Sequence, residues 1–166
     1  MSTLPWMERP TEVARLFNPA FLATLLWFCA RGYSDIDVQG IPYPLIFVAI
    51  PVVLRKSTRE KLPRTTRTNL LGWLANNPES QVRFAEQAAY LVPLIKEGVL
   101  FATNGNRLEL SNLRLLVVSE PENLGTFLKQ ASTEVGDCTK KAEFVGRWFA
   151  KSGDYKTVMA LWGVMP

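Results

Sequence analysis

The sequence contains no histidine, and this absence excludes more chemistry than any other feature of its composition. Without imidazole the chain cannot build a Ser-His-Asp or Cys-His nucleophile, nor a zinc or iron site with histidine ligands. Cysteine is nearly absent too, since Cys29 and Cys138 are the only two. They are too few for a tetrahedral thiolate site or a secreted disulfide framework. Both lie in apolar, helix-like stretches, which predicts buried thiols in a reducing, cytoplasmic compartment.

Phosphate-binding and metal-binding motifs are missing as well. The glycines form neither G-x-x-x-x-G-K nor G-x-G-x-x-G, the two patterns that cradle phosphates. Asp35 and Asp37 share a loop, but no second pair of carboxylates accompanies them to complete a cation cage. We therefore expect no cofactor, no metal and no catalytic activity in this chain.

The apolar runs are too short to cross a membrane. The two longest are Pro19–Ala30, with twelve residues, and Ile41–Leu54, with fourteen, whereas a spanning helix needs about 20. Both are predicted to be buried core elements. The opening MSTLPWMERP lacks the basic and apolar regions of a signal peptide.

What the chain does have is helical patterning in a length of 166 residues, of which 48% are hydrophobic. That is enough for one domain with a real core. Apolar residues at three-four spacing predict a helix over 11–31, broken at Asn18-Pro19 and ending at Gly32. The stretch Leu45–Leu54 is apolar on all sides and can be a buried helix or a strand, with helix favoured. Further helices are predicted at 57–62, at Thr68–Ala75, from Asn77-Pro78 to Glu97, from Ser119 with a break near Gly136, and after Asp154.

A β-hairpin is predicted where Asn104-Gly105 separates Val99–Thr103 from Asn106–Leu110, because this pair favours a type I′ turn. The next stretch, Leu113–Val118, adds a strand or begins a helix. The expected fold class is therefore mainly α with a β-hairpin (α+β), built as a winged-helix-like core with flanking helices. We expect a single domain over 1–166. Its parts are an N-terminal helical segment (1–56), a winged-helix-like unit with the hairpin (57–118) and C-terminal helices (119–166).

Positive charge concentrates in one stretch, although the net charge of the whole chain is only +4. Only Glu60 opposes six cations there, which alternate with hydroxyl residues able to bind phosphates. The stretch is predicted to contact DNA or an acidic face of a partner, although a solvated loop would show the same pattern. Arg107, just past the predicted hairpin tip, can reach a minor groove or simply add solubility. The six cations are Arg55, Lys56, Arg59, Lys61, Arg64 and Arg67.

Five tryptophans are many for this length. A buried core accounts for most of them. Trp6, Trp148 and Trp162 are the candidates for interface anchors, because tryptophan is enriched at binding hot spots.

Four groups of residues carry a resemblance to a known family. They are Glu8-Arg9-Pro10 with Glu12-Val13-Ala14 and Phe17-Asn18-Pro19-Ala20-Phe21; Pro51-Val52-Val53-Leu54 with Thr58-Arg59-Glu60 and Leu62-Pro63; Thr68 with Trp73-Leu74 and Asn77-Pro78; and Gly146-Arg147-Trp148-Phe149-Ala150-Lys151 with Leu161-Trp162-Gly163-Val164 and Pro166. With these motifs the chain resembles the middle component of three-component ABC ATPase systems over nearly its whole length.

The resemblance implies a role that composition alone does not give. Such proteins accompany an SMC-like ABC ATPase and an effector in sets that look like Lamassu-type bacterial defence against phage and plasmids. The implied role is a non-catalytic accessory subunit that couples DNA sensing by the ATPase to the effector, often a nuclease. Contact with DNA would come through the complex, and no membrane is involved. The alternative is a free-standing winged-helix DNA-binding regulator.

Overall fold

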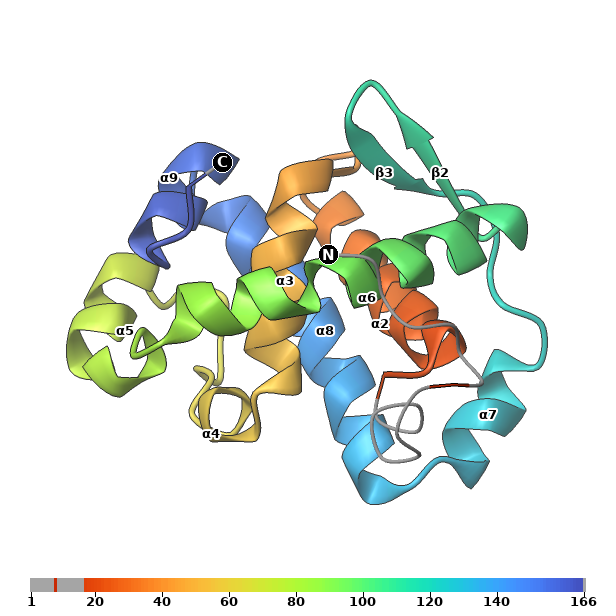
Figure 1. The fold of residues 1–166 in the computed structure, drawn as a ribbon, viewed down its shortest axis with the longest axis horizontal. Helices are drawn as coiled ribbons and strands as arrows, with labels where there is room; N and C mark the ends of the chain where they lie inside the picture. The colour runs from red at the N-terminus through yellow and green to blue at the C-terminus, as the bar shows by residue number, and fades with distance from the viewer. Residues whose placement is uncertain (1–7, 9–16, 166) are drawn as a thin grey trace.

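The computed structural model describes Glu8 and residues 17–165, and the fold is built around packed helices with a small β-sheet at one edge (Figure 1). Helix α2 packs most extensively against α8 and then against α6, so α2 lies between them. The helices are α2 (Pro19–Ser34), α3 (Ile46–Leu54), α4 (Lys56–Arg59), α5 (Leu70–Asn76), α6 (Phe84–Asn104), α7 (Leu124–Gln130), α8 (Thr133–Lys151) and α9 (Tyr155–Leu161), with short 3₁₀ helices η2 (Tyr43–Leu45) and η3 (Pro78–Ser80).

Helix α2 begins at the predicted break. The Asn18 side chain accepts a hydrogen bond from the Ala20 backbone N–H at 2.8 Å, and Pro19 occupies the first turn. The part of the predicted helix before residue 17 lies outside the described residues. The helix continues past Gly32, which was predicted to end it, to Ser34.

Gly32 and Gly146 instead allow α2 and α8 to touch backbone to backbone. A Cβ atom on Gly32 would lie 2.0 Å from the Glu143 carbonyl oxygen, and one on Gly146 would lie 2.1 Å from that of Cys29. Neither distance is compatible with a side chain. The closest approach of the two central helices therefore depends on these two glycines.

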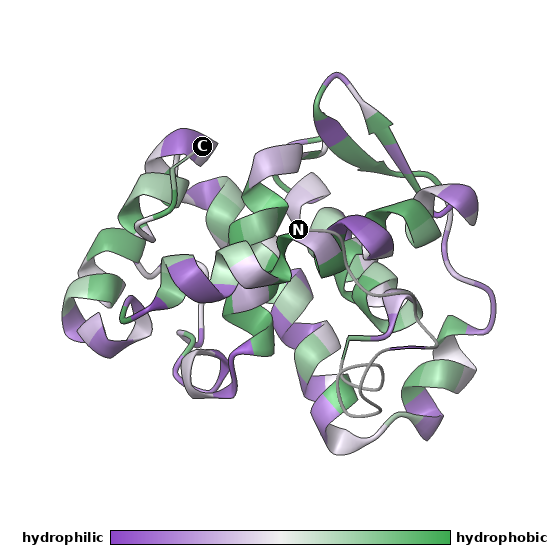
Figure 2. Ribbon diagram, viewed as in Figure 1, coloured by the Kyte–Doolittle hydropathy of each residue, from purple (hydrophilic) through white to green (hydrophobic). Residues whose placement is uncertain are grey.

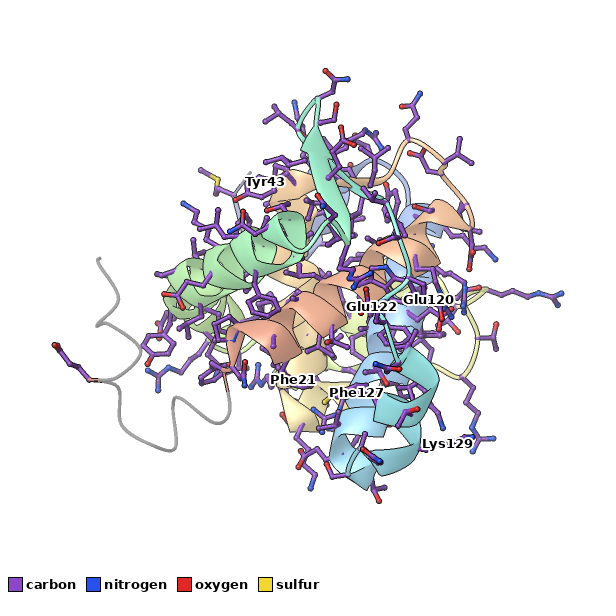
Figure 3. The ribbon with its side chains drawn as sticks, turned by 90° about the vertical axis from the view of Figure 1, so that its right-hand side faces the viewer. Phe21, Tyr43, Glu120, Glu122, Phe127 and Lys129 are labelled. Atoms are coloured by element: carbon purple, nitrogen blue, oxygen red, sulfur yellow. The ribbon has the colours of Figure 1, made fainter. Side chains whose placement is uncertain are left out.

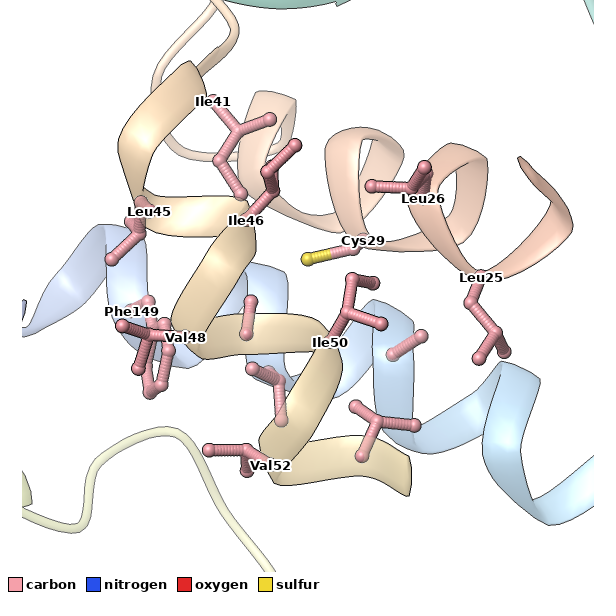
Figure 4. Packing of buried hydrophobic residues seen from close by; sticks show 14 of the residues in the cluster. Leu25, Leu26, Cys29, Ile41, Leu45, Ile46, Val48, Ile50, Val52 and Phe149 are labelled. Carbon is pink, nitrogen blue, oxygen red and sulfur yellow. The ribbon is translucent and has the colours of Figure 1, made fainter. Parts of the chain in front are cut away.

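Helix α3 confirms the helical reading of Leu45–Leu54. Nearly all of its side chains are buried, because it is enclosed by α2, α6 and α8. Figure 4 shows Ile50 of α3 facing Leu25 and Cys29 of α2, with Phe149 of α8 against its other end. Its ribbon is green along most of its length in the hydropathy view, whereas the segment around α4 is mainly purple (Figure 2).

The predicted hairpin at Asn104-Gly105 is wrong. Helix α6 runs through this region, and the Gly105 N–H closes its last turn on the Phe101 carbonyl. The reason is that Val99 and Ala102 extend the buried helical stripe begun by Leu91 and Ile95, so the period is that of a helix. The Asn-Gly pair ends a helix here and does not connect two strands.

The hairpin lies further on, between β2 (Leu108–Ser111) and β3 (Arg114–Val117), so its turn comes eight residues after the predicted one. Its turn consists of Asn112 and Leu113, which have φ values of 50° and 57°, as a type I′ turn requires. Strand β3 settles the open alternative at Leu113–Val118 in favour of a strand.

A third strand, β1 (Ile41–Pro42), pairs with β3, giving an antiparallel sheet of order β1-β3-β2. A mainly helical chain with a small antiparallel sheet confirms the expected α+β class. The winged-helix core stays a prediction.

Two predicted helix boundaries also differ from the structure. The helix expected from Asn77-Pro78 begins as η3, and α6 itself starts only after Arg83, whose φ is 55°. The break expected near Gly136 lies instead at 131–132, between α7 and α8, and α8 is continuous through Gly136. Helix α9 starts as predicted, capped by Asp154. Among the described helices, none is both long enough and apolar enough to cross a membrane.

Candidate partner and nucleic-acid interfaces

The basic stretch divides into cations that hold the fold together and cations that face solvent. Arg55 belongs to the first group, since its Nη1 donates to the carbonyls of Ser80 and Val82, each at 3.1 Å. These bonds tie the end of α3 to the turn before α6. The Arg55 guanidinium is therefore already engaged inside the chain.

Arg59 is the most deeply buried of the six cations, with 3% of its side chain exposed. Its Nε lies 2.9 Å from Asp137 Oδ2, its Nη2 lies 3.0 Å from Glu134 Oε1, and its Nη1 donates to the Val53 carbonyl at 2.9 Å. It thereby joins α3 and α4 to the first turns of α8. In this structure Arg59 is a structural residue and offers no surface to DNA or to a partner.

Two lysines of the stretch pair with nearby glutamates on the surface. Lys56 lies 3.9 Å from Glu60, one helical turn away. Lys61 forms a hydrogen-bonded ion pair with Glu79, and that bond lowers the pKa of the Glu79 carboxyl. Exposed pairs of this kind add little stability, but they neutralise much of the charge of these two lysines.

Arg64 and Arg67 make no side-chain hydrogen bond or ion pair with the described residues, and both are exposed. They lie in the connection between α4 and α5, residues 60–69, here called the basic loop. Its ends are fixed by two buried tryptophans: Trp73 Nε1 donates to the Lys61 carbonyl at 3.1 Å, and Trp148 Nε1 donates to the Thr68 carbonyl at 2.7 Å. The two arginines therefore project from an anchored loop.

A further cation joins the basic loop from a distant part of the sequence. Lys151, in the last turn of α8, places its Nζ 3.1 Å from the Thr66 hydroxyl oxygen. Sequence reasoning missed it, because 85 residues separate it from Thr66 and no local pattern marks it. The structure thus assembles Arg64, Arg67 and Lys151 around one loop.

Two of the three tryptophans predicted as interface anchors, Trp148 and Trp162, are core residues in this structure. Trp148 is 0% exposed and Trp162 is 1% exposed. Trp148 packs edge-on against Trp73 with ring centroids 5.4 Å apart, and Trp162 stacks on Phe84 at 4.6 Å. The buried Trp162 indole N–H has no partner among the described residues. Trp6 lies outside the described residues.

Arg107 lies at the base of the hairpin and not at its tip. Its Nη1 donates to the Glu120 carbonyl at 2.8 Å and to the Ser119 hydroxyl at 3.2 Å, and its Nη2 lies 3.5 Å from Glu122. These contacts hold the connection after β3 against the start of β2. The tip is formed by Asn112 and Leu113, so an arginine that reaches a minor groove from the tip is not what the structure shows.

An apolar groove of about 730 Å³ separates the C-terminal half of α6 from the hairpin. Leu100, Leu110 and Val118 line it while remaining largely exposed, and Tyr43 closes it next to the hairpin (Figure 3). Its polar lining includes Lys96 and Glu109, one of each charge. We call it the apolar groove. It was not predicted, because the hairpin was predicted at the wrong place in the sequence.

Leu113 lies at the hairpin tip and is not among the residues that line the apolar groove. It is 72% exposed and has a φ of 57°, a backbone region that a branched apolar side chain rarely adopts. Its carbonyl accepts a hydrogen bond from the Tyr43 N–H at 2.8 Å, which links the tip to the start of η2. An exposed leucine in a strained position is not explained by folding alone.

A larger hollow of about 1160 Å³ lies between the start of α2, the end of α3, the first half of α6, α7 and the first turn of α8. Phe21 of α2 and Phe127 of α7 are among the residues that line it (Figure 3). Its charged lining mixes Arg83 with Glu86 and Glu122.

The two cysteines are buried, as predicted. Burial raises the pKa of the Cys29 thiol to about 12. Burial also raises that of Cys138, although the nearby Arg59 charge opposes the shift. Both thiols are therefore protonated at neutral pH and are poor nucleophiles. Within residues 17–165 and Glu8, no three potential metal ligands gather.

The chain matches a known protein family. Residues 6–166 match the family model described as ABC-three component (ABC-3C) system Middle Component 3. No curated protein and no solved structure matches the chain.

Proposed function

Because the chain belongs to the Middle Component 3 family of ABC-three component systems, we propose that it is a non-catalytic accessory subunit that binds the ATPase of its system through the apolar groove. In this proposal the ATPase is SMC-like and senses DNA, and the subunit couples that event to an effector such as a nuclease. The setting is Lamassu-type defence against phage and plasmids, in the cytoplasm.

The observation that carries the docking proposal is the exposed leucine at the hairpin tip. Leu113 occupies a left-handed backbone position where Asn or Gly would be better, and 72% of it faces solvent. The apolar groove beside the hairpin is lined by Leu100, Leu110 and Val118. An apolar centre with few charges is the composition of a protein interface core.

The alternative, a free-standing DNA-binding regulator, would use α6 or the hairpin tip to read DNA. The outward-facing residues of α6 include Tyr90, Leu100 and Phe101, with Lys96 and the ion pair of Arg83 with Glu86. The tip presents Leu113. A DNA-reading face needs several cations near the phosphates, so these elements favour the subunit over the regulator.

The proposal is tested by co-expression with the neighbouring ATPase and effector genes and recovery through a tag on this chain. The variant Leu100→Ser with Leu113→Asn should reduce ATPase recovery at least about tenfold, because two apolar anchors of the interface are lost. The matched control is Leu71→Ser with Val38→Asn, which removes two exposed apolar side chains outside the groove. Equal recovery by both variants would refute docking through the groove.

A second outcome separates the subunit from the regulator. If the wild-type chain recovers no ATPase and is eluted alone, the accessory-subunit proposal itself fails. Thermal unfolding of each variant, expected to match the wild type within a few degrees, shows that lost recovery reflects the surface and not the fold.

A further inference from the structure

We propose that Arg64, Arg67 and Lys151 form a contact for the phosphate backbone of duplex DNA. The inference deepens the proposed function and rests on it in one respect: it gives this chain a direct share of the DNA contact that the complex makes. From the sequence, all six cations of the basic stretch were predicted alike to contact DNA or a partner. The structure selects two of them and adds a third from α8.

The three cations of this contact have no carboxylate partner in the part of the chain that the structure describes. Arg55 is bonded to carbonyls, Arg59 is buried in ion pairs, and Lys61 is paired with Glu79. Arg64 and Arg67 have no such partner among the described residues. The one polar contact that the Lys151 side chain makes with the described residues is with a neutral hydroxyl, that of Thr66. Cations without carboxylate partners keep their full charge for phosphates and for the release of counterions.

The basic loop that carries the two arginines is held in place by hydrogen bonds and by a buried leucine. The Thr68 carbonyl accepts a 2.7 Å hydrogen bond from buried Trp148, and the Thr65 hydroxyl accepts one from the Arg67 N–H at 3.0 Å. Leu62 anchors the start of the loop in the core with 6% exposure. Binding therefore requires little loop ordering, which would otherwise weaken it.

The residue composition around the basic loop suits phosphate groups better than an acidic protein surface. No exposed large apolar side chain lies within residues 55–69, and the nearest in sequence is Leu71. Threonines 65 and 66 supply hydroxyl donors between the two arginines. Protein interfaces have an apolar core, whereas phosphate contacts come from Arg, Lys, Ser and Thr side chains. The surface around the basic loop has the second composition.

The test is binding of the full chain to a fluorescent duplex DNA of about 30 base pairs, measured by anisotropy at several salt concentrations. The variant Arg64→Gln, Arg67→Gln, Lys151→Gln should bind at least about tenfold more weakly at low salt. Its slope of log affinity against log salt should be less steep by about 0.9 for each lost phosphate contact. The matched control, Arg83→Gln, Lys96→Gln, Lys129→Gln, changes the net charge equally and should bind DNA almost as the wild type does.

Three results would overturn the proposal. One is equal weakening by both triple variants, which would show only a general charge effect. Another is unchanged DNA binding by the Arg64, Arg67, Lys151 variant. The third is competition by poly-glutamate as effective as that by unlabelled DNA, which would assign the loop to an acidic partner. ATPase recovery by the same variant should stay normal, so failure of this inference and failure of the subunit proposal remain distinguishable.

Discussion

The basic loop and the apolar groove lie at different ends of one molecule and differ in almost every physical respect. The basic loop lies beside α4 and α5, and the apolar groove lies at the hairpin (Figure 1). The loop presents charge and hydroxyls and is tied down by buried indole N–H groups. The groove presents apolar side chains and lies beside a hairpin whose turn is strained. Their chemistry suits different partners, so under the two proposals above this subunit would bind DNA with one surface and the ATPase with the other.

Both surfaces depend on the close contact of α2 with α8, and removing it should have the largest effect. Gly146→Val should destabilise the fold by about 3 kcal/mol or more, because its Cβ would lie 2.1 Å from the Cys29 carbonyl oxygen. Denaturant unfolding measures the loss. DNA binding and ATPase recovery should fall together.

Gly136→Ala is the matched control on the same helix. A Cβ there meets nothing within 4 Å, so the change should be neutral or stabilising by up to about 1 kcal/mol. If Gly146→Val were no more harmful than Gly136→Ala, the backbone contact between α2 and α8 would not be what positions the two surfaces.

The next prediction separates the buried arginine from its exposed neighbours. Arg59→Met should cost about 2 kcal/mol, because it strips the Val53 carbonyl, Glu134 and Asp137 of their shared partner. The figure is below the usual cost of breaking a buried pair, because both carboxylates are partly exposed. Arg64→Met should change stability by less than about 0.5 kcal/mol.

Thermal and denaturant unfolding of the two methionine variants gives the comparison directly. Arg59→Lys should destabilise the fold less than Arg59→Met does, because lysine keeps the positive charge. It should still be less stable than the wild type, because lysine lacks the planar guanidinium that reaches three acceptors. Equal destabilisation at Arg59 and Arg64 would contradict the division of the basic stretch into structural and exposed cations.

The sequence was sufficient for the features that depend on local chemistry. Asn18-Pro19 and Asp154 start helices where predicted, and the all-apolar Leu45–Leu54 is the buried helix. The prediction of a hairpin at Asn104-Gly105 was wrong because the local turn signal is outweighed by the burial of the apolar stripe of α6. Buried Arg59 could not be foreseen, since its carboxylate partners lie more than 70 residues away.

The contribution of Trp148 to the basic loop can be measured against that of Trp162. Trp148→Phe removes the donor to the Thr68 carbonyl and should cost about 1–2 kcal/mol. Backbone amides near the end of the basic loop should exchange faster with deuterium, and DNA affinity should fall a few-fold. Trp162→Phe removes an indole N–H that has no partner among the described residues, and should leave loop exchange unchanged. Similar exchange in both variants would show that the indole bond does not order the loop.

The smallest effect on stability, with the opposite sign, is predicted at the hairpin tip. Leu113→Gly should stabilise the chain by about 0.5 kcal/mol, because glycine adopts the positive φ of the turn without strain and little buried area is lost. ATPase recovery should nevertheless fall, since the exposed side chain is the one that a partner would cover. Thermal unfolding and co-purification of the same variant decide the matter. A gain in stability with unchanged recovery would mean that Leu113 is strained without serving the interface, and docking would then have to rest on Leu100, Leu110 and Val118.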